Sequence, residues 1–166
     1  RDYTYVFYSD NDMVSFMKSF DHNFKTNVFD KLPCKIMKID IFRYCLLYKC
    51  GGVYIDIDYQ FINTFDFSQF ALTLPLSVGS VDTDFKINNC VLSSTPNHPF
   101  WGKVLDTLSE NMSVIISDFK KYKRNKMLYK NFVLNSTGPG LLTSVYKTYF
   151  LDNTDIKLIE KNTFHP

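Results

Sequence analysis

Hydrophobic and polar residues follow two different periods along the chain, and the period separates the expected helices from the expected strands. Apolar residues recur at a helical spacing over residues 13–20, 34–49, 99–116 and 141–149. Short runs rich in β-branched and aromatic residues stand at residues 3–8, 53–55, 70–74, 87–93 and 156–159. We therefore expect an α/β domain.

Turn and cap residues mark the ends of several of these elements. Residues 9–12 read Ser-Asp-Asn-Asp and predict a cap for the first helix. Gly51 and Gly52 predict the end of the helix at 34–49, because glycine accepts a positive φ without steric cost. Pro75 is expected to end the strand at 70–74, since proline cannot donate to a sheet ladder.

Two carboxylates follow the strand at 53–55. Asp56 and Asp58 would share one face of an extended chain, where they repel each other unless a cation lies between them. Hard divalent cations with oxygen ligands are the usual partner, and the alternative is a strand end with solvated acids. An EF-hand loop does not fit, because residues 59–61 supply neither acids nor glycine. A haloacid-type phosphatase would have Thr or Val where Gln60 stands.

The residues around this pair extend the motif well beyond two aspartates. The string reads Asp40-x-x-Arg43-Tyr44, then Gly51-Gly52-x-Tyr54-x-Asp56-x-Asp58. It closely resembles the glycosyltransferases with a sugar-binding Asp-x-Asp motif, the family of yeast α-1,6-mannosyltransferase and α-1,4-galactosyltransferase, with the clostridial glucosylating toxins as distant relatives. The resemblance is dense over residues 36–60 and thinner, but ordered, over most of the rest.

The resemblance implies a single glycosyltransferase domain over residues 1–166. Its fold would be GT-A-like, that of nucleotide-diphospho-sugar transferases, with a mixed sheet flanked by helices. Relatives have another strand, the first of the nucleotide-binding sheet, before the one expected at 3–8, and they continue beyond the segment that residues 164–166 resemble to a His and a Gly-Ser-Trp stretch. Neither is found here, so we expect the first strand and the C-terminal motif to be lacking; a fragment and a shortened form are both open.

The resemblance also implies roles for individual residues. Asp56 and Asp58 would be catalytic and would hold Mn²⁺ or Mg²⁺, with Asp58 as the direct ligand and Asp56 on the nucleotide ribose or a metal-bound water. Contact with the donor sugar or nucleotide is implied for Asp40, Arg43, Tyr44, Gly52, Asp56, Asn89, Thr137 and Gly138. Purely structural roles remain as alternatives for several of these residues: a surface ion pair for Asp40 and Arg43, a strand cap for Asn89, and a helix-capping turn at 136–140.

Three functions are compatible with these patterns. The first is a metal-dependent retaining glycosyltransferase that moves a hexose from a UDP- or GDP-sugar to a hydroxyl of a glycan, glycolipid or protein, by front-face displacement. The second is a non-catalytic nucleotide-sugar or sugar binding module with the same fold. The third and weaker one is a phosphotransferase built on the Asp-x-Asp strand.

Composition and charge limit the class of protein and the partners that the sequence fits. A 166-residue chain with 45% hydrophobic and 22% charged residues is expected to be one globular domain, and a net charge of +2 does not by itself imply nucleic-acid binding. Basic and aromatic residues interleave over 119–130, which suits either an anionic partner or a solvated amphipathic helix with its aromatics inside. The four cysteines fit no zinc spacing, and His98 is expected to cap the following helix. No apolar run approaches membrane-spanning length.

Overall fold

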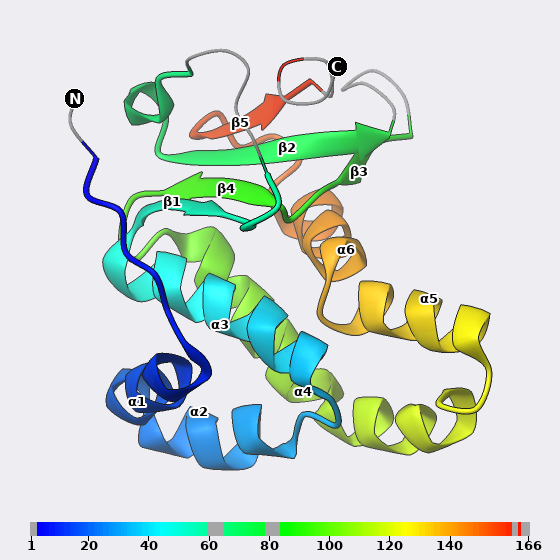
Figure 1. Ribbon diagram of the computed structural model, residues 1–166. Coiled ribbons are helices and arrows are strands. Elements are labelled where there is room, and N and C mark those ends of the chain that lie inside the picture. The colour runs from blue at the N-terminus through cyan, green and yellow to red at the C-terminus, as the bar shows by residue number, and fades with distance from the viewer. Residues whose placement is uncertain (1–2, 60–64, 79–83, 161–162, 164–166) are drawn as a thin grey trace.

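The computed structural model describes residues 3–59, 65–78, 84–160 and 163, which form helices packed against a five-stranded sheet (Figure 1). The expected α/β class is confirmed. The α-helices are α1 (Asp10–Phe20), α2 (His22–Asn27), α3 (Lys35–Cys50), α4 (Pro99–Tyr122), α5 (Lys126–Ser136) and α6 (Pro139–Tyr149). The strands are β1 (Gly52–Ile55), β2 (Leu72–Val78), β3 (Lys86–Ile87), β4 (Val91–Ser94) and β5 (Ile156–Ile159), and two short 3₁₀ helices are η1 (Phe29–Lys31) and η2 (Phe67–Gln69).

The sheet is mixed, as the resemblance implied, and β2 is its central strand. Leu72 pairs with Ser94 of β4 on one edge of β2 and with Ile156 of β5 on the other. β4 and β3 run antiparallel to β2, β5 runs parallel to it, and β1 is antiparallel to β4. The carboxyl end of β1 therefore lies beside the start of β4.

The core lies between the sheet and the helices α3, α4 and α6, which Figure 1 shows on one side of the sheet. Trp101 of α4 is fully buried and stacks on Tyr44 of α3, with ring centroids 5.4 Å apart. This stacking fixes α3 against α4. The described residues contain four free cysteines. Among the described helices, none combines the length and apolarity needed to cross a bilayer.

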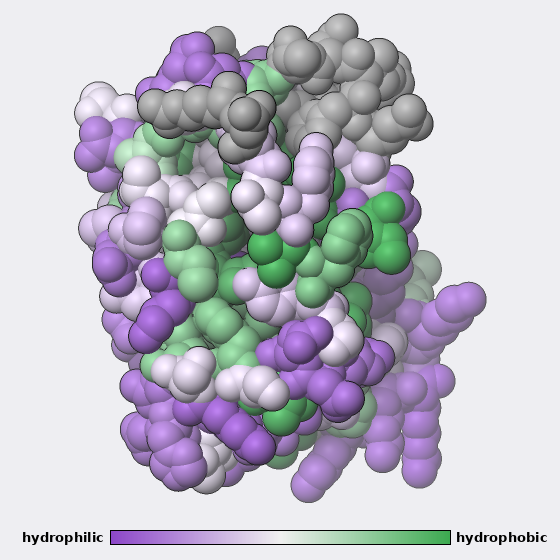
Figure 2. All heavy atoms as spheres, turned by 60° about the vertical axis from the view of Figure 1, so that its left-hand side comes forward, coloured by the Kyte–Doolittle hydropathy of each residue, from purple (hydrophilic) through white to green (hydrophobic). Residues whose placement is uncertain are grey.

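The strand expected at residues 3–8 is absent from the described structure. Residues 3–9 form an extended segment outside the sheet, with Tyr5 81% and Phe7 89% exposed. Figure 2 shows apolar side chains gathered on the face that carries this segment. A β-rich composition favours an extended backbone, but a strand also needs a hydrogen-bonded neighbour, and no described strand pairs with this segment.

Three other boundaries differ from the sequence-based expectation. β2 continues through Pro75, whose carbonyl accepts a hydrogen bond from the Asn88 N–H (2.7 Å), so the missing proline donor does not end the strand. The strand expected at 87–93 is split into β3 and β4 by residues 88–90. α4 runs six residues beyond the expected end at 116. Residues 60–64, 79–83 and 164–166, which include Gln60, much of the loop expected at 77–86 and His165, lie outside the described residues.

Candidate active site

The junction between α3 and β1 positions the candidate site. Gly51 ends α3 with φ +67°, and a Cβ at this residue would lie 2.7–2.8 Å from atoms of Pro96 and from the Ser94 carbonyl oxygen. Only glycine satisfies both the left-handed backbone and this close approach. The chain then turns directly into β1, so residues from the middle of α3 and from the end of β1 come together.

Asp40 and Arg43 are buried, each with 4% of its surface exposed. They face the same side of α3 and form an ion pair of 3.3 Å between Arg43 Nη2 and Asp40 Oδ1. The alternative of a surface ion pair is therefore wrong. Burial of two charges is costly unless each is paired and hydrogen-bonded, so the surrounding contacts decide what this pair does.

Arg43 joins the α3 pair to the Asp-x-Asp segment. Its Nη1 donates to Asp56 Oδ1 at 2.9 Å and to the Asn89 carbonyl oxygen at 2.8 Å. One guanidinium thus pairs with both Asp40 and Asp56 and also ties them to the approach to β4. The expectation that α3 holds this pair beside the carboxylates is confirmed.

Both carboxylate oxygens of Asp40 are occupied within the protein. Asn89 Nδ2 donates to Oδ1 at 3.1 Å, and the Thr137 hydroxyl donates to Oδ2 at 3.0 Å. Burial raises the pKa of Asp40, while the charge of Arg43 and these two hydrogen bonds oppose the increase. Asp40 therefore acts as the centre that joins three elements: α3, the β3–β4 connection and the α5–α6 turn.

Tyr44 adds two hydrogen bonds to this buried network. Its hydroxyl donates to the Thr137 carbonyl oxygen at 2.9 Å and receives a hydrogen bond from Asn89 Nδ2 at 3.2 Å. Burial raises the pKa of Tyr44 well above its ordinary value, so the phenol stays protonated and remains a donor. Thr137 thereby contacts α3 through both its hydroxyl and its backbone.

Tyr54 is a site residue that the list of expected contacts did not include. Its hydroxyl donates to Asp56 Oδ1 at 2.9 Å, and the Arg43 guanidinium lies over its ring, 4.6 Å from the centroid. Burial raises the pKa of Tyr54, which keeps the hydroxyl protonated. A signal was available in the sequence, because Tyr54 and Asp56 are two residues apart where the expected strand ends, and such a spacing places side chains on one face of an extended chain.

Asp56 and Asp58 differ in their surroundings. β1 ends at Ile55, and a turn closed by the Tyr59 N–H on the Asp56 carbonyl oxygen (3.0 Å) follows, so the expected alternation of an extended chain does not continue to Asp58. The Asp56 side chain is 31% exposed, and the hydrogen bonds that it accepts from Arg43 and Tyr54 both use Oδ1. Asp58 is exposed and forms no side-chain hydrogen bond or ion pair with the described residues.

This donor set fits a divalent cation that is completed by other ligands. Asp56 Oδ2 and the Asp58 carboxylate are hard oxygen donors two residues apart in the sequence; Asp56 is partly exposed and Asp58 is exposed. Magnesium in particular is usually bound by one or two carboxylates together with phosphate oxygens and waters. No cluster of three or more His, Cys, Asp or Glu side chains occurs within residues 3–59, 65–78 and 84–160, so the protein alone does not enclose a metal there.

The remaining expected residues have mixed outcomes. Gly138 is buried as the N-cap of α6, directly after Thr137. Gly52 is exposed at the start of β1 and stands outside the network, with φ +93° and open space where a Cβ would be. His98 caps α4, as expected, because its Nδ1 accepts a hydrogen bond from the Phe100 N–H at 3.2 Å.

Comparison with known proteins agrees with the motif. Residues 1–73 match the family described as the glycosyltransferase sugar-binding region containing the DXD motif. A mannosyl phosphorylinositol ceramide synthase of Saccharomyces cerevisiae is 29% identical over 148 residues, covering 89% of this chain and 35% of the relative. An uncharacterized glycosyltransferase of Acanthamoeba polyphaga mimivirus is 30% identical over 168 residues, covering 95% of this chain and 58% of that protein.

Residues 1–73 therefore match the sugar-binding region of the DXD glycosyltransferases, and the resemblance drawn from the sequence is confirmed. The chain spans about a third of the length of the yeast relative, 35%. A solved PaToxG glycosyltransferase is also similar, with a TM-score of 0.46 and 21% identity, over 83% of this chain and 40% of that one.

Proposed function

We propose that this chain is the donor-binding part of a metal-dependent, retaining glycosyltransferase that moves a hexose from a nucleoside-diphosphate sugar to an acceptor hydroxyl. The observation that carries the proposal is the Arg43 bridge, in which one buried guanidinium holds Asp40 and Asp56 together at the end of β1. The sugar-binding family match over residues 1–73 and the mannosyltransferase relatives support the class of reaction.

A cation would be held by Asp58 and by the outer oxygen of Asp56. When bound, it supplies positive charge that stabilises the departing diphosphate. The protein's own contribution is to fix Asp56: Arg43 and Tyr54 both bond to its Oδ1, which leaves Oδ2 turned to other partners. A carboxylate held in this way loses less side-chain freedom when a cation arrives.

The donor sugar would lie beside Asp56, the partly exposed member of the Asp40–Arg43 network. Asp40 uses both oxygens within the protein, so we assign it, together with Asn89 and Thr137, to holding the shape of the sugar pocket and the orientation of Arg43. Direct sugar contact by Asp40 would require these contacts to rearrange. The relatives include an inositol phosphoceramide mannosyltransferase, which suggests mannose as the hexose and a glycolipid as the acceptor.

Retention of anomeric configuration is what the resemblance to the family implies, and the described carboxylates of the network bear on how it would occur. Asp40 is saturated with hydrogen bonds and buried, and Asp56 is paired with Arg43. We infer front-face displacement: the acceptor oxygen bonds to the anomeric carbon as the carbon–oxygen bond to the diphosphate breaks. The acceptor proton passes to the departing diphosphate oxygen, so charge and atoms balance.

The proposal is tested with a panel of UDP- and GDP-hexoses, each measured by thermal shift with and without Mn²⁺. A ligand at about 100 times its Kd stabilises the folded state by roughly 2.7 kcal/mol, which corresponds to a rise of about 5–11 °C for a chain of this size. We expect one nucleotide sugar to produce this rise only with the metal, and to release its nucleoside diphosphate when an acceptor is supplied.

Two outcomes would redirect the proposal. Binding without any release of nucleoside diphosphate, even with the acceptor present, would favour the non-catalytic binding module with the same fold. No stabilisation by any nucleotide sugar, with or without metal, would contradict both the glycosyltransferase and the binding-module proposals.

A further inference from the structure

The end of α4, the turn after it and the first half of α5 form an exposed basic corner, defined here as residues 118–130. It holds six of the 19 Lys and Arg residues of the chain and one of its 17 acidic residues. The rest of the chain therefore carries 13 basic and 16 acidic residues. The six basic side chains are all exposed: Lys120, Lys121, Lys123, Arg124, Lys126 and Lys130.

Exposed aliphatic side chains lie among these cations. Met127 is 70% exposed and Leu128 47% exposed, both in the first turn of α5, and Val114 on the neighbouring part of α4 is 54% exposed. The only acid of the corner, Asp118, is paired with Lys121 at 2.7 Å. Cations and aliphatic groups on one convex corner are the combination that binds the interfacial region of an anionic bilayer.

The aromatic residues of the corner point inward, as the amphipathic-helix alternative expected. Phe119 packs against Tyr129 and Phe132, with ring centroids 6.1 and 6.3 Å apart, and Tyr122 packs against Phe132 at 5.8 Å. Proteins that bind single-stranded nucleic acid stack bases on exposed aromatic rings. These rings are occupied with one another, which favours a lipid surface over a nucleic acid.

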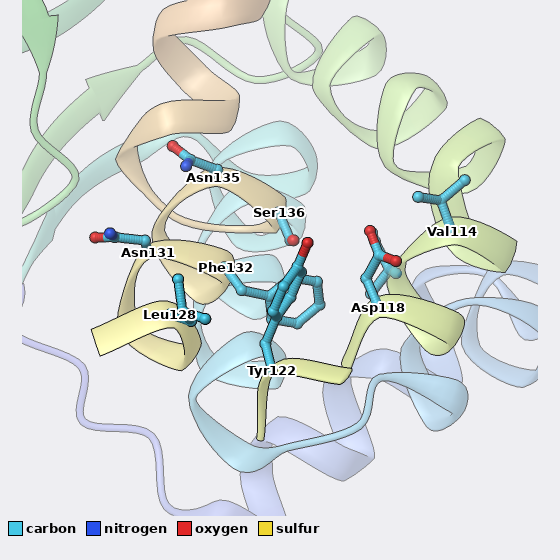
Figure 3. Close-up of a pocket in the computed structure, with 9 residues that line it drawn as sticks. Val114, Asp118, Tyr122, Leu128, Asn131, Phe132, Asn135 and Ser136 are labelled. Carbon is cyan, nitrogen blue, oxygen red and sulfur yellow. The ribbon is translucent and has the colours of Figure 1, made fainter. Parts of the chain in front are cut away.

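A cavity of about 370 Å³ opens between α4 and α5 beside this corner. Figure 3 shows Val114, Leu128 and Phe132 among its lining residues, together with Asp118, Tyr122, Asn131, Asn135 and Ser136. The cavity thus combines apolar and hydrogen-bonding side chains, and its one carboxylate, that of Asp118, is paired with Lys121.

We propose that the basic corner docks on the surface of an anionic membrane, with Met127 and Leu128 entering the interface and the cations contacting lipid phosphates. Clusters of about four to eight Lys or Arg on an amphipathic helix are typical of binding to anionic lipids. This inference is independent of the proposed glycosyl transfer, because none of its residues belongs to the Asp40–Arg43 network.

The corner is connected to that network by one rigid helix. α5 begins in the corner at Lys126 and ends at Ser136, next to Thr137, whose hydroxyl bonds to Asp40. Eleven helical residues span about 16 Å. Docking through the corner would therefore place lipid at one end of a helix whose other end adjoins the candidate active site.

The test is flotation of the whole chain with vesicles of phosphatidylcholine alone or mixed with phosphatidylserine. We expect binding to the mixed vesicles only. Each basic residue near an anionic surface contributes about fivefold to partitioning, so the double variant Arg124→Gln/Lys126→Gln should bind about 30-fold more weakly. The matched control, Lys18→Gln/Lys49→Gln, removes the same charge from exposed sites on α1 and α3 and should bind like the original chain.

A third variant, Met127→Ser, tests entry of the apolar side chain and should weaken binding severalfold without a change in charge. Circular dichroism of each variant establishes that it is folded. Equal binding to neutral and mixed vesicles, equal losses in the corner and control variants, or full binding by Met127→Ser would overturn the proposal. Tighter binding to an oligonucleotide than to the vesicles, lost in the corner variant, would overturn it in favour of a nucleic-acid partner.

Discussion

Replacing Thr137 with valine removes one hydroxyl from the middle of the buried network while almost keeping the side-chain shape. Thr137 is fully buried, and its hydroxyl donates to Asp40 Oδ2 at 3.0 Å. Valine offers no donor, so one oxygen of a buried carboxylate would lose its partner. The backbone carbonyl of residue 137 would still accept the hydrogen bond from Tyr44.

The size of the effect follows from the burial and charge of Asp40. A hydrogen bond to a charged group contributes roughly 1.5–3 kcal/mol, and the lack of solvent around both partners leaves little screening to reduce it. We therefore expect Thr137→Val to lower the free energy of unfolding by about 2 kcal/mol. For a chain of this length the melting temperature should fall by about 4–8 °C.

Thr107 supplies the matched control. Its hydroxyl is buried in α4 and has no hydrogen-bond partner among the described residues. Thr107→Val makes the same chemical change at a hydroxyl that forms no hydrogen bond with the described residues. The free energy of unfolding of this variant should therefore be unchanged or slightly higher. Thermal and urea denaturation followed by circular dichroism measure both variants. Equal losses in the two, or no loss in Thr137→Val, would refute the assigned role of the Thr137 hydroxyl.

Two further predictions concern single hydrogen bonds. Tyr54→Phe removes the hydroxyl that donates to Asp56 Oδ1 but keeps the ring beside Arg43. Because Asp56 is partly exposed, we expect metal-dependent donor binding, measured by calorimetry, to weaken by about 1 kcal/mol. Unchanged affinity would contradict the role of Tyr54 in positioning Asp56. His98 must be neutral at Nδ1 to accept from the Phe100 N–H, and burial lowers its pKa, opposed by Asp155. The unfolded chain therefore binds the proton more readily, so this contribution to stability is present above about pH 6.5 and is lost as the pH falls through the folded pKa. A urea series from pH 8 to pH 5 should show that His98→Asn, which can still cap, lacks this component; an identical pH dependence in both proteins would count against it.

Short-range features of the site were predictable from the sequence. The spacing of Asp40 and Arg43 on a helix, the glycine stop and the immediate entry into β1 place Arg43 beside Asp56, and the structure confirms this arrangement. Each step depends on residues within about a turn or one strand of each other. Local propensity and backbone geometry are sufficient for such steps.

Contacts between distant segments were not predictable in the same way. Thr137 bonds to Asp40 across 97 residues, and Asn89 bonds to it across 49. The resemblance associated these positions with the donor, but only the packing of α5, α6 and β4 around α3 shows that they hold Asp40. The prediction of a strand at 3–8 was wrong for the same reason, because strand formation depends on a partner strand that the local sequence does not specify.

We infer that Asp56 and Asp58 hold a cation that recruits the nucleotide sugar. Asp58→Asn keeps the shape of the side chain and removes its charge, and the Asp58 side chain forms no hydrogen bond or ion pair with the described residues. Isothermal titration calorimetry of the nucleotide sugar, with and without Mn²⁺, should be run on the original chain, on Asp58→Asn and on the exposed control Asp152→Asn. We predict Mn²⁺-dependent binding in the original chain and in Asp152→Asn, a strong loss in Asp58→Asn, and unchanged melting of the metal-free proteins. Equal Mn²⁺-dependent affinity in all three, or binding that needs no metal in any of them, would contradict the claim.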